Sequence, residues 1–393
     1  MSRRLFILTN DPVPFGTANA NYIRNFAKAI AATGMEVIAI GMKSSPNNPK
    51  FYCSDSYEKI QFWNFNESKL GGKNYLRAYF NYKKNYLEAL KHFEAGEGDY
   101  IIVYTTELDT AKVAIDYSLV PCEHKAFCEV EWFQPYQYKY GRLNPLYILW
   151  KIGFQYRMRK FQKAIPISTN LERLLIKKGC KTLVVPALVD TDDMRVERTT
   201  DDKYIHFIYP GSASDKDSFP CMMNALKGVE LEKRERVRLH LTGNMSYEKL
   251  QDILGKDRDL LEELRDNLIF HGWLSYDDLM GLYGKSDFLL IARARNVVTL
   301  SNFPSKVPEM MSYGVVPVCS DVGDYTEIYL RDGIDSIQFE NDSVSSCADA
   351  IRRAIEIKES SNLAKMQKSA RETVKGKLDY RNWGDRIVAF LQN

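Results

Sequence analysis

The chain has 393 residues, of which 45% are hydrophobic and 27% are charged, and its formal net charge at pH 7 is +3. This length exceeds what one hydrophobic core usually organises, so we expect two domains. The small net charge argues against a dedicated nucleic-acid-binding protein, and the seven scattered cysteines, without a CxxC pair or histidines at metal-ligand spacing, are typical of a reduced, cytosolic protein.

The first half of the chain predicts strands that alternate with helices. Apolar runs over residues 5–8 and 37–40 flank a helical pattern over 20–33. This β-α-β opening implies a parallel sheet with right-handed crossovers. Further strands are expected over residues 60–65, 100–104, 126–130, 164–167 and 182–185, and helices over 76–95 and 146–163.

The loop after the first strand does not carry a dinucleotide fingerprint. It reads TNDPVPFGT over residues 9–17, with one glycine where GxGxxG needs three. We also find no GxxxxGK[ST] motif and no Ser-His-Asp order. A nicotinamide dehydrogenase is therefore disfavoured, while Gly16 and Thr17 remain either plain turn residues or part of a ligand-binding loop.

Residues 132–171 contain no Asp or Glu, although seven Lys and Arg residues alternate with aromatic residues there. Basic residues mixed with aromatic residues suit an anionic membrane surface or a lipid diphosphate, and stacking on those aromatics would suit nucleic acid instead. A buried helix with a solvated basic side is the other interpretation. The apolar run near the N-terminus is too short for a signal peptide, and no stretch approaches ~20 apolar residues, so we expect peripheral contact at most.

A polar stretch over residues 186–203 is the expected linker to a second series of about 180 residues. Its strands are expected over 204–209, 238–242, 268–271, 288–292 and 315–319, and its helices over 219–226, 275–284 and 306–313. Two Rossmann-like halves result, and the cleft between them is the default ligand site.

Two loops of this second half carry residues suited to phosphate. Residues 209–217 read YPGSASDKD, in which small residues permit close approach of a ligand and Lys216 can reach a diphosphate. Residues 302–305 form a turn with Ser305 as N-cap candidate, followed by a helix with Lys306 and Glu309 on one face, which Gly314 can end. A helix N-terminus attracts phosphate, Lys306 adds a full charge, and Glu309 can accept hydrogen bonds from ribose hydroxyls. Taken alone, the 209–217 segment favours a solvated loop lysine at Lys216, and phosphate binding is favoured only when Lys306 is directed at the same crevice.

The segment over residues 301–327 resembles the nucleotide-sugar motif of retaining glycosyltransferases of family 4, in the variant that reads roughly FPTKxxESxxxGxPV. The matching residues are Phe303, Pro304, Ser305, Lys306, Glu309, Gly314, Pro317 and Val318. The resemblance implies the α/β GT-B fold, with two Rossmann-like domains facing across a cleft and a C-terminal helix that crosses back. The expected N-terminal acceptor domain comprises residues 1–187 and 378–393, and the nucleotide-sugar donor domain comprises 188–377.

The resemblance also implies roles for residues outside this segment. Glu131-Trp132 is similar to the EWY sequence of a family 4 subgroup, which places Glu131 near the reacting sugar; a strand-end Glu paired to a Lys or Arg is the open alternative. Three departures from the family stand out: Gly16-Thr17 replaces a double glycine, Ser212 stands where an arginine is common, and Ser301 stands where a first Glu contacts the donor sugar. The implied donor-binding residues are Gly16, Thr17, Gly211, Ser212, Gly272, Trp273, Ser301, Asn302, Phe303, Pro304, Ser305 and Glu309.

The implied activity is metal-independent transfer, without a cofactor, of a hexose from a UDP- or GDP-sugar to a hydroxyl of a glycan or lipid-linked acceptor. Glu131, Lys216 and Lys306 are the implied catalytic residues. The family retains the anomeric configuration by a front-face substitution, so no enzymic general base is required. The implied setting is cytoplasmic synthesis of surface polysaccharide or glycoconjugate at the inner face of the membrane, with no nucleic-acid partner.

Two other functions stay open. A non-catalytic GT-B subunit could bind a nucleotide or stabilise an active transferase. A sugar-nucleotide epimerase would need more carboxylates and histidines in the cleft than His124, His206 and His271 provide.

Overall fold

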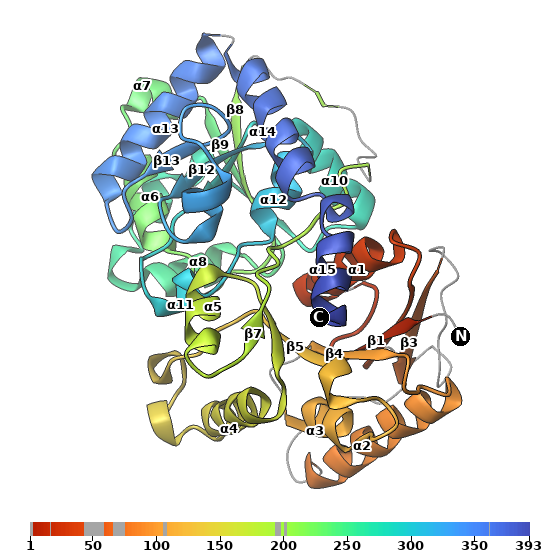
Figure 1. The fold of residues 1–393 in the computed structure, drawn as a ribbon. Helices are drawn as coiled ribbons and strands as arrows, with labels where there is room; N and C mark the ends of the chain where they lie inside the picture. The colour runs from red at the N-terminus through yellow and green to blue at the C-terminus, as the bar shows by residue number, and fades with distance from the viewer. Residues whose placement is uncertain are drawn as a thin grey trace. The chain divides into compact units, whose positions relative to one another are not determined.

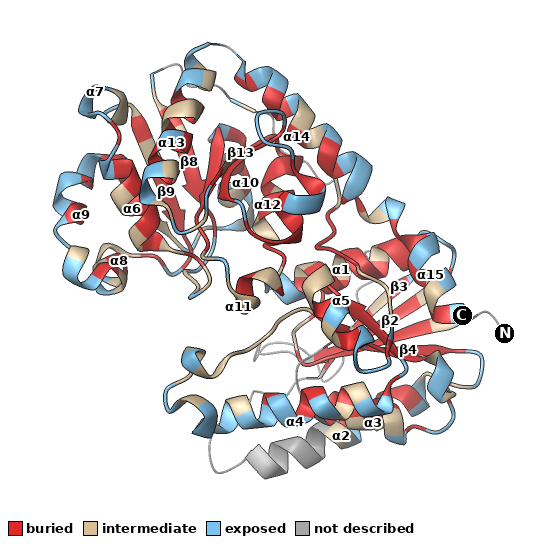
Figure 2. Ribbon diagram, turned by 60° about the vertical axis from the view of Figure 1, so that its left-hand side comes forward, coloured by how far each residue is buried: buried red, intermediate tan, exposed pale blue. Residues whose placement is uncertain are grey.

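The computed structural model describes residues 3–15, 17–42, 59–65, 75–104, 108–192, 198–199, 203–360 and 362–393. They form two compact units, one of residues 1–188 with 380–393 and the other of residues 189–379. Each unit is built on a parallel sheet (Figure 1). Most strand residues are buried on both faces (Figure 2), which explains why the strands read as continuous apolar runs in the sequence.

The N-terminal unit has a seven-stranded sheet in the order β3-β2-β1-β4-β5-β6-β7, with every described pairing parallel. The order reverses beside β1, so β1 and β4 form the topological switch point of this sheet. The strands are β1 (Arg4–Thr9), β2 (Glu36–Met42), β3 (Ile60–Phe65), β4 (Tyr100–Tyr104), β5 (Lys125–Glu129), β6 (Lys163–Pro166) and β7 (Lys181–Thr182). The helices are α1 (Ala18–Ala31), α2 (Tyr75–His92), α3 (Leu108–Asp116), α4 (Pro145–Lys160), α5 (Thr169–Ile176) and α15 (Gly384–Gln392).

The last helix, α15, packs against α1 within this unit. A side chain at Gly384 would meet the Ala29 carbonyl oxygen at 2.1 Å, so glycine is required where the two helices cross. Lys163 Nζ donates to the Leu391 carbonyl at 2.6 Å and anchors the end of α15 to the start of β6. The predicted return of the C-terminal helix to the N-terminal domain is confirmed.

The C-terminal unit has a six-stranded parallel sheet in the order β10-β9-β8-β11-β12-β13, which is also reversed beside its first strand. The strands are β8 (Ile205–Tyr209), β9 (Val237–Thr242), β10 (Leu268–Gly272), β11 (Phe288–Ile291), β12 (Val316–Ser320) and β13 (Ile337–Phe339). The helices are α6 (Phe219–Lys227), α7 (Leu231–Arg234), α8 (Tyr247–Leu254), α9 (Leu260–Glu263), α10 (Tyr276–Lys285), α11 (Val297–Leu300), α12 (Lys306–Ser312), α13 (Val344–Glu359) and α14 (Leu363–Lys377).

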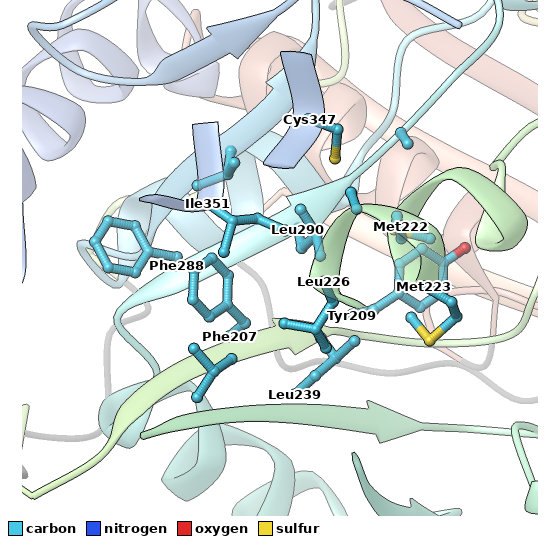
Figure 3. Packing of buried hydrophobic residues seen from close by; sticks show 14 of the residues in the cluster. Phe207, Tyr209, Met222, Met223, Leu226, Leu239, Phe288, Leu290, Cys347 and Ile351 are labelled. Carbon is cyan, nitrogen blue, oxygen red and sulfur yellow. The ribbon is translucent and has the colours of Figure 1, made fainter. Parts of the chain in front are cut away.

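One face of this second sheet packs on α6 and α13. Figure 3 shows Tyr209 of β8 beside Met222 and Met223 of α6, and Phe207 of β8 beside Phe288 of β11. These side chains are almost fully buried. Their packing holds β8 and β11 side by side, and the loops that follow both strands are therefore rigidly placed.

The α/β fold class expected from the sequence is confirmed, and two local expectations change. The strand expected over 182–185 is shorter, since β7 ends at Thr182 at the edge of its sheet. Beyond Thr182, the Leu183 N–H donates to the Ala164 carbonyl and the Val185 N–H donates to the Pro166 carbonyl, so the chain stays hydrogen-bonded to β6 without forming a regular strand. Of the expected linker, residues 193–197 and 200–202 lie outside the described residues. Within the described ranges, none of the helices combines the length and the apolar content needed to span a membrane.

Three histidines form a ladder across β8, β9 and β10. His206 Nδ1 lies 2.8 Å from His240 Nε2, and His240 Nδ1 lies 2.8 Å from His271 Nε2. Because neighbouring strand residues such as Phe207 and Leu239 belong to the core, the histidines project from the opposite face. Burial, followed by the charges of His206, His271, Arg238 and Lys285, lowers the pKa of His240 to about 3. The central histidine of the ladder, His240, is therefore uncharged at neutral pH.

We expect the protein to lose stability as the pH falls below about 6.5, the ordinary pKa of histidine. The unfolded chain binds a proton at His240 that the folded chain resists down to about pH 3, so acid favours unfolding. Between pH 7.5 and pH 5, the titration of His240 alone should lower the free energy of unfolding by about 2 kcal/mol. Urea unfolding at both pH values measures this loss, and His240→Gln should reduce the difference between them. His92→Gln, which alters an exposed histidine, is the control and should leave the pH dependence unchanged.

Candidate functional site

The candidate site of the C-terminal unit lies at the switch point of its sheet. The neighbouring strands β8 and β11 end at Tyr209 and Ile291, and the chain leaves them in opposite directions along the sheet. The segments that follow occupy residues 210–218 and 292–305, the second of which includes the short helix α11. Ser218 N donates to the Ala292 carbonyl at 2.7 Å and joins the two segments. In open α/β sheets this is where ligands bind.

A buried carboxylate, Asp217, organises the side chains at this point. Arg293 Nε donates to Asp217 Oδ1 at 2.6 Å, and the Tyr209 hydroxyl donates to Oδ2. Lys306 Nζ lies 3.5 Å from the same Oδ2 and 3.6 Å from the centre of the Tyr209 ring. The lysine is therefore held by a charge on one side and an aromatic face on the other.

The electrostatics of this cluster favour an anion. Burial by itself would raise the pKa of Asp217, but Arg293 and Lys306 outweigh it and hold that pKa at about 2. Burial lowers the pKa of Lys306 to about 8, with Asp217 acting in the opposite direction. At neutral pH two cations therefore face one carboxylate, and the net positive charge is available to a ligand such as phosphate.

The loop over residues 301–305 is tied to this cluster through Asn302, whose Oδ1 accepts from Arg293 Nη1 at 3.0 Å. Phe303 is buried and packs on the rings of Tyr325 and Tyr329, at 6.2 and 5.5 Å between centres. Ser301 and Pro304 are also buried. The loop over residues 301–305 is thus anchored by its apolar residues, and Asn302 directs it toward Arg293.

Ser305 does not cap α12 as expected from the sequence. Its backbone is already helical, with φ −57° and ψ −27°, and its side chain makes no capping bond within the described structure. The third residue of the helix is Pro308, which has no N–H to offer a cap, and Val307 N already donates to the Pro304 carbonyl. The start of α12 therefore offers fewer amides to a phosphate than predicted, and the positive charge comes from side chains.

Glycines bring the loops after β8, β9 and β10 together. Gly243 N donates to the Gly272 carbonyl at 2.7 Å, and Gly211 N donates to Thr242 Oγ1 at 2.9 Å. A Cβ on Gly243 would lie 2.8 Å from the Gly211 carbonyl carbon, so this approach requires glycine. Gly211 and Gly272 have positive φ values of 83° and 62°. The ligand-facing edge of the sheet is continuous from β8 to β10.

Four further candidates lie along this edge or beside it. The carbonyl of Ser212 lies 3.5 Å from the Tyr209 hydroxyl, next to Asp217. Trp273 follows Gly272 and is 79% exposed. Lys216 precedes Asp217 and is half-buried. Glu309 is half-buried on α12, with Tyr283 Oη 3.5 Å from its Oε1.

The remaining candidates belong to the N-terminal unit. Gly16 lies outside the described residues. Thr17 is the N-cap of α1, and its Oγ1 accepts from Ala20 N at 3.0 Å. Glu131 is half-buried two residues beyond β5. The buried carboxylate at the end of that strand is instead Glu129, which pairs with Arg157 of α4 at 2.8 Å.

Sequence reasoning missed Arg293, Tyr209 and the role of Asp217. The signal that could have found them is positional, because Tyr209 ends β8 and Arg293 comes two residues after β11. A buried charged residue directly after a strand needs a partner or a function. Within the described ranges, no three or more His, Cys, Asp or Glu side chains gather in a way that could hold a metal ion.

The fold and the C-terminal unit can now be classified. The chain is similar over nearly its whole length to solved two-domain glycosyltransferases, so its fold is GT-B. The sucrose-phosphate synthase of Thermosynechococcus elongatus is 15% identical with a TM-score of 0.72, covering 99% of this chain and 98% of that chain. HepE of Anabaena, solved with UDP and glucose, is 13% identical with a TM-score of 0.67, covering 99% of each chain.

A third neighbour, WaaG, a glycosyltransferase involved in lipopolysaccharide biosynthesis, is 13% identical with a TM-score of 0.66, covering 98% of this chain and 99% of that chain. No curated protein matches the chain by sequence. Residues 190–373 match the family model of glycosyl transferases group 1. The C-terminal unit is therefore similar to the glycosyl transferases group 1 over nearly all of its length, and the cluster around Asp217 lies within the matched residues.

Proposed function

We propose that this protein is a retaining glycosyltransferase that moves a sugar from a nucleoside diphosphate sugar to a hydroxyl of a glycan or glycolipid. The observation that carries the proposal is the placement of Lys306 and Arg293 around Asp217 at the switch point of a group 1 glycosyltransferase domain. Departure of a diphosphate is the difficult part of such a reaction, and fixed cations stabilise the charge that develops.

Each candidate then has a proposed task. Lys306 contacts the departing diphosphate, and Lys216 approaches it from the loop after β8. Arg293 positions Lys306 through Asp217 and holds Asn302 by a direct hydrogen bond. Glu309 accepts hydrogen bonds from the ribose hydroxyls. The exposed Trp273 and the backbone at Gly211, Ser212 and Gly272 line the rest of the donor subsite. Gly16, Thr17 and Glu131 of the N-terminal unit would complete a two-domain site, which stays a prediction.

The proposed transfer is a front-face substitution. The bond between the anomeric carbon and the diphosphate oxygen breaks, and a bond from the acceptor oxygen to the same face of that carbon forms. The acceptor proton passes to the departing phosphate oxygen, so no side chain has to act as general base. Lys306 and Lys216 stabilise the negative charge on the leaving group. We place the chain in the EWY and FPTKxxE subgroup on the residues Glu131-Trp132 and 303–309.

The donor nucleotide follows from a binding screen. Among proteins of the same fold, HepE has been solved with UDP-glucose, so UDP-sugars are the first donors to test, followed by GDP-, ADP- and dTDP-sugars. A ligand present at about 100 times its Kd stabilises the folded protein by about 2.7 kcal/mol. We expect the melting temperature to rise by several degrees with one nucleotide class, and no rise with any of the four would contradict the proposal.

A second candidate function rests on Ser301. This buried residue stands where the resemblance places an acid that contacts the donor sugar. A chain that binds the nucleotide but has lost transfer would be a non-catalytic GT-B partner of an active transferase. Slow hydrolysis of the bound donor by the purified chain alone excludes this alternative, whereas nucleotide binding without any hydrolysis or transfer supports it.

A further inference from the structure

Helix α4 is apolar on two opposite sides, and in the part of the chain that the structure describes only one of them is buried. Trp150, Phe154 and Arg157 face inward, as expected for residues spaced four and three apart. Ile148 and Ile152 lie on the opposite side of the helix and are 40% and 47% exposed. Scattered apolar residues are normal on a protein surface, but a second apolar side on one helix is not required by the fold.

The loop before α4 continues this apolar side. Figure 2 shows exposed residues both along α4 and in the loop that precedes it. Asn144 holds the loop in place, since its Oδ1 accepts from Leu146 N and its Nδ2 donates to the Lys139 carbonyl. The large exposed apolar side chains between residues 136 and 152 are Tyr136, Tyr140, Leu143, Leu146, Ile148, Leu149 and Ile152.

The charges around this apolar side have one sign. Residues 132–171 contain no acidic residue. Over the part of the chain that the structure describes, no acidic side chain forms an ion pair with any of the exposed Lys139, Arg142, Lys151, Arg159 and Lys160. Helix α2 differs, because its Lys83 and Lys84 pair with Asp116 and Glu88. The uncompensated positive charge therefore belongs to α4 and its loop.

The type of exposed side chain favours lipid over nucleic acid. Bases stack on aromatic rings, but Trp150 is 6% exposed and packs on Trp132, Phe133 and Phe154. The exposed side of α4 itself presents leucine and isoleucine. Aliphatic residues next to Lys and Arg are the pattern of segments that lie in the interface of a bilayer with anionic lipids.

We propose that α4 and the preceding loop, residues 136–160, dock the protein onto the surface of an anionic lipid bilayer. Leu143, Ile148 and Ile152 enter the boundary between headgroups and acyl chains, and the basic residues contact lipid phosphates. The docking does not depend on whether the chain transfers sugar.

Flotation with vesicles tests this proposal. We expect the protein to float with vesicles of phosphatidylcholine mixed with phosphatidylglycerol, to float poorly with phosphatidylcholine alone, and to be released by salt. Replacing Arg159 and Lys160 by Gln should weaken binding about thirtyfold, because each basic residue near an anionic surface contributes about fivefold. The pair Ile148→Ser and Ile152→Ser should weaken it about tenfold or more.

Matched controls alter exposed residues elsewhere. Leu119→Ser changes a leucine of the same unit that is more exposed than either isoleucine, and Lys256→Gln changes an exposed lysine of the other unit. Both variants should float like the unaltered protein. Melting curves of all variants check that the fold is kept. Failure of the unaltered protein to float, or equal flotation of all variants, overturns the proposal. So does tight binding of single-stranded RNA by this surface, or a dimer without lipid binding that the isoleucine variants abolish.

Discussion

Lys306→Ala should reduce kcat/KM for sugar transfer by about 10²–10³-fold, the effect of removing one preorganised charge donor from a developing anion. The fold should survive, because Asp217 keeps its bonds to Arg293 and Tyr209 after the lysine is shortened. Transfer assays with the donor found in the nucleotide screen measure the loss, and circular dichroism and melting curves check the fold. Lys256→Ala removes an exposed lysine of the same unit and should leave transfer unchanged.

Glu309→Ala tests the other half of the donor subsite. This substitution should raise KM for the donor and abolish most of the transfer activity. Near-normal turnover in both Lys306→Ala and Glu309→Ala would refute the site. Loss of turnover in Lys306→Ala together with a collapsed melting curve would assign the lysine to structure rather than to the diphosphate.

The pH dependence of nucleotide binding separates these roles further. Burial lowers the pKa of Lys306 to about 8, so the free protein loses this charge as the pH rises through 8. If the ammonium binds the diphosphate, Kd should rise about tenfold for each pH unit above 8. Lys306→Arg stays charged throughout and should give a flat profile. A rise of the same slope in both proteins would contradict direct contact by Lys306.

The strands of this fold could be predicted from sequence because a parallel sheet buries both faces. Runs such as residues 5–8 and 288–291 are continuously apolar and stand between helical patterns. The order of the strands is not contained in any such run. The strand order brings Tyr209, at the end of β8, beside the end of β11. Only the assembled sheet therefore shows that the switch point lies between β8 and β11.

The candidate site divides in the same way. Lys306, Glu309 and the loop before them are close in sequence, so their shared turn and helix face could be predicted. Arg293 and Asp217 are 76 residues apart, and their pairing requires β8 and β11 to be neighbours. The capping role of Ser305 was wrong because propensity favours serine there while Pro308 removes the amide that the cap would bind.

The buried pair of Glu129 and Arg157 is the second place where one substitution should have a large effect. Arg157 Nη2 lies 2.8 Å from Glu129 Oε2, and both side chains are almost inaccessible to solvent. Burial raises the pKa of Glu129, with Arg157 acting in the opposite direction. The other oxygen, Oε1, has no hydrogen-bond partner among the described residues. The pair joins the end of β5 to the inner side of α4.

Arg157→Met should destabilise the protein by about 3–5 kcal/mol, because it leaves the Glu129 carboxylate buried without its cation. Glu129→Leu should lower the free energy of unfolding by a similar amount. Urea unfolding measures the loss in both single variants. Asp116→Ala, which breaks the exposed pair with Lys83, is the control and should cost about 1 kcal/mol or less.

The double variant Glu129→Leu with Arg157→Met decides what the pair does. Removing both charges from an apolar layer is often neutral or stabilises by about 1–4 kcal/mol, because desolvation of two ions offsets their attraction. The open hydrogen-bonding position at Oε1 makes that outcome the expected one here. A double variant as unstable as either single variant would show instead that the ion pair stabilises the folded state on balance. If stability recovers but vesicle binding does not, then the pair serves to hold α4 in register on β5, with Arg157 inward and Ile148 and Ile152 outward.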